Sequence, residues 1–129
     1  MRRLAALLAL GAMVACGSDP APDDSALHQD IAGHQAGAEV TFHATLVADP
    51  QDAGGHERML VRSGAGDGLE IDHNITLARR VPAHNGDQVV VHGQLYLDAD
   101  KAGVHCTHAH TSSGCPVPGW IDLAGSRYQ

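Results

Sequence analysis

The chain of 129 residues carries eight lysine and arginine residues against 15 aspartate and glutamate residues, a formal net charge of −7 with neutral histidines. A surface this acidic repels phosphate backbones, so nucleic acid is not expected as a partner. Only one Trp, two Tyr and one Phe are available to stack on bases, which also argues against nucleic-acid binding. One domain is expected at this length.

The N-terminus has the features of an export signal. Met1-Arg2-Arg3 is followed by an apolar run over residues 4–15, which is too short to span a bilayer. We therefore predict a signal peptide over residues 1–15, whose removal would take away two arginines and move the formal charge from −7 to −9.

The residues Met13-Val14-Ala15-Cys16 resemble the lipobox of bacterial lipoproteins, in which the cysteine is lipidated and becomes the first mature residue. We expect a membrane partner through a lipid on Cys16, with simple secretion as the alternative. Gly17 stands where many inner-membrane lipoproteins have aspartate, so a periplasm-facing anchor in the outer membrane is favoured.

A flexible tether is predicted over residues 16–24, which are rich in proline and aspartate and have nothing to bury. The domain is expected to cover residues 25–129. It opens with a short helix, for which Ser25 is the candidate N-cap, Leu27 and Ile31 are spaced as one apolar face, and Gly33 is a plausible end.

Alternating apolar and polar residues predict three strands in the first half of the domain. The first covers residues 40–46, with Phe42 on its apolar side, and Pro50 and Gly54-Gly55 break the pattern after it. Residues 56–63 and 69–72 give the next two strands, and residues 74–88 lose the alternation.

Residues 88–98 predict the longest strand, in which Gly93 indicates a bend or bulge, and residues 104–109 predict a fifth. A small hairpin about Ala124-Gly125 closes the chain. Five short strands with an irregular crossover predict a mainly β fold: a small five-stranded, OB-like Greek-key barrel with a short N-terminal helix and a C-terminal hairpin.

Cys106 and Cys115 are the two cysteines that remain if Cys16 is lipidated. Exported proteins meet oxidising conditions, so a disulfide between them is favoured over two thiols. Closing a loop of about ten residues would stabilise the fold by roughly 2.5–3 kcal/mol in the chain-entropy model.

The alternative for this segment is a zinc or copper site, since the chain has ten histidines. A disulfide would remove the thiolate ligands, and the site would then rest on His105, His108 and His110. If residues 104–110 are extended, Cys106, His108 and His110 share one face, while His105 and Thr107 share the other. Further ligands would have to come from His43, His56, His73 or His92.

Several segments together carry a family likeness: His56-Glu57-Arg58, Ile71-Asp72-His73-Asn74, Gly86-Asp87 and Gly119-Trp120-Ile121. In order and spacing, residues 27–129 resemble DUF3465, a family of small exported bacterial proteins of unknown function. The resemblance implies an exported single domain and no established activity. The family pattern usually reads His-Trp-Thr-His-His-Asp where this chain has Cys106 in the tryptophan place and Ala109-His110 at the end.

The candidate ligand-binding residues are His73, Asn74, His105, Thr107 and His108, which follow or end predicted strands, where small barrels often place functional groups. The alternative is that His73 bonds to backbone and that Asn74 is a turn residue. We expect a non-enzymatic, lipid-anchored domain that binds a small ligand or an envelope protein. A hydrolase or nuclease is a further alternative, for which Ser112, Ser113, Asp72 with His73, and Glu57-Arg58 are candidates.

Overall fold

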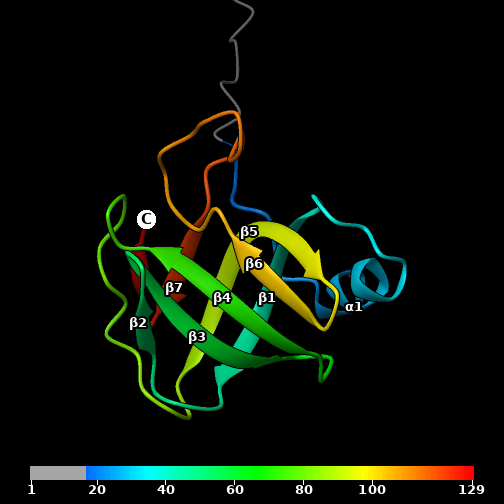
Figure 1. Cartoon of the computed structure of the whole chain (residues 1–129), viewed down its shortest axis with the longest axis horizontal. Helices are drawn as coiled ribbons and strands as arrows, with labels where there is room; N and C mark the ends of the chain where they lie inside the picture. Colours follow the sequence, from blue (N-terminus) through cyan, green and yellow to red (C-terminus); the bar gives the residue numbers. More distant parts are fainter. Residues whose placement is uncertain (1–16) are drawn as a thin grey trace, which may run out of the picture.

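A computed structural model describes residues 17–129 (Figure 1). The predicted signal peptide and the lipidation of Cys16 lie outside these residues and stay predictions. Within the described part, no helix has the length and apolar character needed to cross a membrane.

The helix α1 (Asp24–Ala32) begins inside the segment predicted as a tether. Its N-cap is Asp23, whose side chain accepts a hydrogen bond of 2.9 Å from the amide of Ala26, so Ser25 is not the cap. Leu27 is buried against the barrel, and the helix ends at Gly33 as the sequence predicts.

The described strands are β1 (Glu39–Leu46), β2 (Gln51–Ala53), β3 (His56–Ser63), β4 (Gly68–Asn74), β5 (Gln88–Asp98), β6 (Lys101–His105), β7 (Trp120–Leu123) and β8 (Ser126–Tyr128). Five of them follow the order β1-β3-β4-β6-β5, and β5 pairs again with β1, which closes a barrel. All these pairings are antiparallel except β4 with β6. The predicted OB-like barrel is confirmed.

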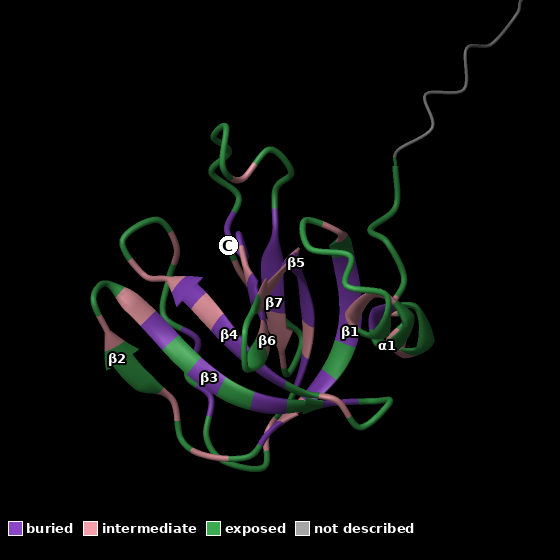
Figure 2. Cartoon of the chain, turned by 45° about the vertical axis from the view of Figure 1, so that its right-hand side comes forward, coloured by how far each residue is buried: buried purple, intermediate pink, exposed green. Residues whose placement is uncertain are grey.

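The barrel interior follows the predicted alternation. Figure 2 shows buried and exposed residues alternating along β3, where Met59 and Val61 point inward and Leu60 is exposed. Inward residues of all five barrel strands form one apolar core, which contains Phe42, Met59, Ile71, Val91, Leu95 and Val104 among others. Burial of these side chains is the main driving force for the fold.

The long strand β5 changes partners along one edge near Gly93. It pairs with β7 over residues 89–92 and with β6 over residues 94–98, while its other edge pairs with β1. A Cβ atom at Gly93 would collide with the carbonyl oxygen of His105, so glycine allows this close approach.

The strands outside the barrel were predicted only in part. The short strand β2 was not predicted; it pairs with β3 through a turn at Gly54-Gly55, both of which have positive φ. The C-terminal hairpin of β7 and β8 is confirmed, and its turn residues Ala124 and Gly125 have φ values of 49° and 81°.

The fifth barrel strand is shorter than predicted. β6 ends at His105, because Cys106 has a φ of 57°, in the left-handed region that breaks extended backbone. Residues 106–109 are therefore not strand. The predicted face shared by Cys106, His108 and His110 does not exist, and neither does the face shared by His105 and Thr107.

Candidate functional site

The predicted disulfide between Cys106 and Cys115 is present and staples a loop onto the end of β6. We call residues 106–119 the disulfide loop. Inside it, the amide of Cys115 donates to Ser112 Oγ at 3.1 Å, and the amide of Gly119 donates to the carbonyl of His108 at 2.9 Å. The two sulfurs are thus structural and are not available as metal ligands.

His73 lies inside the barrel end and has no solvent exposure. Its Nε2 donates to the carbonyl oxygen of Arg79 at 2.8 Å, and its Nδ1 accepts from Thr107 Oγ1 at 2.8 Å. Burial lowers the pKa of His73, and the carbonyl of Arg79 partly opposes this shift. Two predicted site residues, His73 and Thr107, are therefore brought together, but as a neutral internal link between two loops.

Asn74 follows His73 and forms a local turn. Its Oδ1 accepts hydrogen bonds from the amide and the hydroxyl of Thr76, at 3.0 Å and 2.7 Å. This is the turn role that the sequence analysis kept as the alternative.

His105 lies half-buried on the outer side of the barrel. Its Nε2 donates to Gln94 Oε1 at 3.0 Å, and its ring meets the Tyr96 ring edge-on, with 5.4 Å between centroids. Burial lowers the pKa of His105; the charge of Asp72 opposes this, whereas His108 and His56 add to it. His105, His108 and His56 are therefore electrostatic neighbours, and His56 was proposed only as a possible metal ligand.

His108 and His110 lie in the disulfide loop, and the Nδ1 of His108 donates to the carbonyl of His110 at 2.7 Å. Their ring centroids are 6.4 Å apart, and His110 is exposed. In residues 17–129 no three His, Cys, Asp or Glu side chains form a group that could hold a metal ion. The geometry therefore gives no support to the zinc or copper hypothesis.

A cluster of polar side chains covers the outer face of β3, β4, β5 and β6. The hydroxyl of Tyr96 donates to Asp72 at 2.6 Å, and the guanidinium of Arg58 lies 3.1 Å from Glu70 and 3.2 Å from Asp72. Lys101 Nζ donates to Glu70 at 2.9 Å. We call Arg58, Glu70, Asp72, Tyr96 and Lys101 the Tyr96 network.

The Tyr96 network is partly shielded from water. Glu70 is 8% exposed, and the Tyr96 ring lies so close over Gly103 that any side chain there would collide with it. Burial raises the pKa of Tyr96 far above its ordinary value, and the hydrogen bond to Asp72 and the charges of Asp72 and Glu70 add to the shift. The phenol is thus a fixed proton donor between two carboxylates.

Two shallow hollows border this network. One of about 250 Å³ has Arg62, Glu70 and Lys101 in its lining, and the other, of about 140 Å³, has Asp49, Arg58 and Glu70. Both are also lined by Leu60, which is 48% exposed. Glu70 and Leu60 therefore join the two hollows into one uneven surface.

The sequence analysis missed this surface as a site. Arg58 with Glu57 and Asp72 with His73 were considered as hydrolase or nuclease candidates. In the structure Glu57 points inward and its Oε2 accepts from the Val81 amide at 2.8 Å, so Glu57 and Arg58 lie on opposite faces. The outward alternation of Arg58, Glu70 and Asp72 was the signal that could have found the network.

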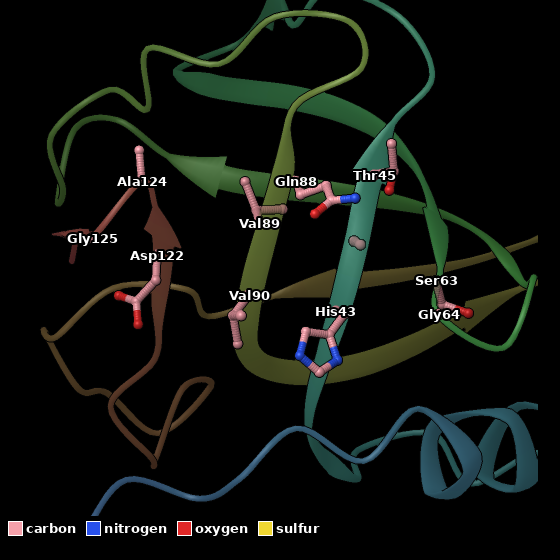
Figure 3. A pocket seen from close by; sticks show the side chains of 11 residues that line it. His43, Thr45, Ser63, Gly64, Gln88, Val89, Val90, Asp122, Ala124 and Gly125 are labelled. Carbon is pink, nitrogen blue, oxygen red and sulfur yellow. The ribbon is translucent and has the colours of Figure 1, made fainter.

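A larger cavity lies elsewhere, on the outer side of β1 and β5 beside the turn of the β7–β8 hairpin (Figure 3). Its volume is about 520 Å³, and its polar lining residues are His43, Thr45, Ser63, Gln88 and Asp122. His43 is held by Asp24 at 3.1 Å, and Asp122 by Arg127 at 2.8 Å. None of the predicted ligand-binding residues lines this cavity, whereas His43, which was considered as a further metal ligand, does.

The described residues give no support to the hydrolase candidates. The hydroxyl oxygen of Ser112 accepts from the Cys115 amide, and within residues 17–129 no serine hydroxyl is hydrogen-bonded to a histidine ring. His73 points inward and Asp72 outward on β4, so the carboxylate of Asp72 does not orient His73 as a general base.

The comparisons with known proteins give one match. The family model described as "Protein of unknown function (DUF3465)" matches residues 10–129. No curated protein and no solved structure matches the chain.

Proposed function

The chain belongs to the DUF3465 family, and from its sequence and geometry we propose that it is an exported, lipid-anchored binding domain of the bacterial envelope. Its task would be to hold a small polar ligand against the Tyr96 network. The basic N-terminus, the apolar run and the lipobox-like Met13-Val14-Ala15-Cys16 support export and anchoring.

The observation that carries the proposal is the carboxylate of Glu70, which is buried on an outer sheet face and lies at the junction of two hollows. Charged groups held out of water interact more strongly with a ligand than solvated ones do. Arg58 and Lys101 can donate further hydrogen bonds, and Leu60 can contact an apolar part of the ligand. This face, on strands β3 and β4, is also the one with which barrels of this type bind oligosaccharides and oligonucleotides.

The acidic composition favours a ligand other than nucleic acid. Of the predicted site residues, His105 fits the proposal best, since its ring packs against Tyr96. His108 adds a second imidazole near His105, while His73, Thr107 and Asn74 support the loops around them.

Chemical-shift mapping tests the proposal. The ¹⁵N-labelled protein is titrated with N-acetylated sugars, dipeptides, dicarboxylates and inorganic phosphate. We expect at least one probe to shift amides of β3, β4 and β6, and Y96F and H105A to weaken that binding about tenfold, the effect of losing roughly 1.4 kcal/mol.

H43A is the matched control, because His43 lines the cavity beside the β7–β8 turn and does not contact the Tyr96 network. Binding by this variant should equal that of the parent protein. Shifts confined to the cavity of His43, or no shift with any probe, would contradict the proposal.

A further inference from the structure

The disulfide loop belongs to an uncharged segment of an acidic protein. Residues 102–121 contain no Asp, Glu, Lys or Arg, although 18% of the whole chain is charged and its net charge is −7. An acidic surface is repelled by anionic phospholipid, whereas an uncharged loop can approach it without that cost. The loop is therefore the part of the domain best suited to lie against a membrane.

The loop presents a fixed shape. The disulfide closes it, and Gly119 packs so tightly against the Cys106 carbonyl that a side chain there would collide with it. Most of its residues from 109 to 118 are exposed (Figure 2), including the apolar Val117 between two prolines. Prolines restrict the backbone on both sides of Val117 and lower the entropy lost when this segment makes a contact.

The segment that precedes α1 lies at the same end of the barrel. Figures 1 and 2 both show the first described residues and the disulfide loop at the top of the molecule. Asp19 lies 2.9 Å from the guanidinium of Arg127, which stacks on the ring of Trp120, the residue after the loop. The Asp23 amide also donates to the carbonyl of Thr41 at 2.8 Å. The segment before α1 is therefore attached to the barrel beside the base of the loop.

Covalent geometry limits the distance between Asp19 and the proposed lipid on Cys16. Cys16 precedes Asp19 by three residues, and three residues span at most about 11 Å. A lipid on Cys16 would therefore hold this end of the barrel close to the bilayer surface. The ion pair of Asp19 is exposed and weak by itself, and the Asp23 hydrogen bond to the barrel supplies a second attachment.

We infer that the disulfide loop is the surface of the domain that faces and contacts the phospholipid headgroups. This inference rests on the proposed lipid anchor at Cys16. The orientation directs the exposed Pro116-Val117-Pro118 segment of the loop toward the bilayer. It leaves the hollows around Leu60 open to the aqueous side.

Tryptophan quenching by lipids tests this orientation. The full chain is expressed in bacteria, purified from membranes, and reconstituted in vesicles of phosphatidylethanolamine and phosphatidylglycerol that contain brominated phosphatidylcholine. V117W places a probe on the loop, and L60W is the matched control, because Leu60 is also exposed but lies on β3. Both variants keep Trp120, and the quenching of the parent protein is subtracted.

We expect quenching of V117W to exceed that of L60W by about twofold or more, since tryptophan is readily accommodated at a membrane interface. Equal quenching, or stronger quenching of L60W, in a lipidated protein would overturn this inference alone. A parent protein whose mass shows no lipid would overturn the proposed anchor and this orientation together. Thiol counting on each variant checks that the disulfide is intact.

Discussion

His73 and His105 lie at the ends of neighbouring strands, β4 and β6, and both were predicted to bind a ligand. His73 is fully buried, and both its ring nitrogens are used in hydrogen bonds to two loops. His105 is half-buried on the outer face, where it packs against Tyr96. The direction of a side chain at a strand end therefore separates a structural histidine from a candidate for binding.

Removing each imidazole ring should have very different effects on stability. H73A leaves the hydroxyl of Thr107 and the carbonyl of Arg79 without their partner, in a space that the alanine does not fill. We expect the free energy of unfolding to fall by about 3 kcal/mol or more for H73A, and by roughly 1 kcal/mol or less for H105A. Urea denaturation at neutral pH measures both, and equal losses would contradict the assignment.

Loss of the disulfide should cause the next largest loss of stability, because the bridge holds Thr107 and the rest of its loop near His73. Replacing both cysteines in C106S/C115S opens a loop whose ends are nine residues apart, which should lower the free energy of unfolding by about 2.5–3 kcal/mol. The same loss should appear when dithiothreitol is added to the parent protein. A urea midpoint that does not respond to the reductant would show that the bridge does not form.

Much of this architecture could be predicted from the sequence. The alternation in residues 40–46, 56–63 and 88–98 fixed the faces of three barrel strands, because one side must be buried. The three-residue strand β2 was missed, since Pro50 and two glycines hid so short a pattern. The early end of β6 was missed because nothing in the residue type of Cys106 indicates a positive φ.

The candidate site was harder to predict than the fold. His73 and Glu57 are polar residues that point into the barrel end, where loops satisfy them, and this burial depends on contacts with Arg79, Thr107 and Val81 from distant parts of the chain. The Tyr96 network likewise forms only when four strands come together. Export and lipidation depend on residues outside the described part and stay predictions.

The buried His73 should also make the stability of the protein depend on pH. The pKa of His73 is lowered in the folded protein, so below its ordinary value of 6.5 the unfolded chain binds more protons than the folded one. The stability that depends on a neutral His73 is fully present above pH 6.5. It is lost as the pH falls toward the lowered pKa that His73 has in the folded protein. Each such histidine can account for at most about 1.4 kcal/mol per pH unit.

Urea denaturation at pH 7.5 and pH 5.5, chosen on either side of about 6.5, measures this effect. We expect the parent protein to lose stability at the lower pH and H73A to lose less. Some dependence should remain in H73A, because burial also lowers the pKa of His92 and His105. An identical pH dependence in both proteins would argue against a buried neutral His73.

A substitution in the Tyr96 network should have the smallest effect on stability. Y96F removes one hydroxyl from a partly exposed network, and we expect a loss of about 1 kcal/mol or less. In an alkaline absorbance titration, the same variant should lack a tyrosine that ionises far above the ordinary pKa of 10. Y128F is the control and should retain that late component.

The protonation state of His73 tests the central claim most directly, namely that the inward histidine is a structural link. Long-range ¹H–¹⁵N spectra of the imidazole rings distinguish the two neutral tautomers and follow their titration. We predict that His73 stays neutral at pH 6.5, with its proton on Nε2 and Nδ1 unprotonated. A ring that titrates at its ordinary pKa, or that averages both tautomers, would contradict the claim.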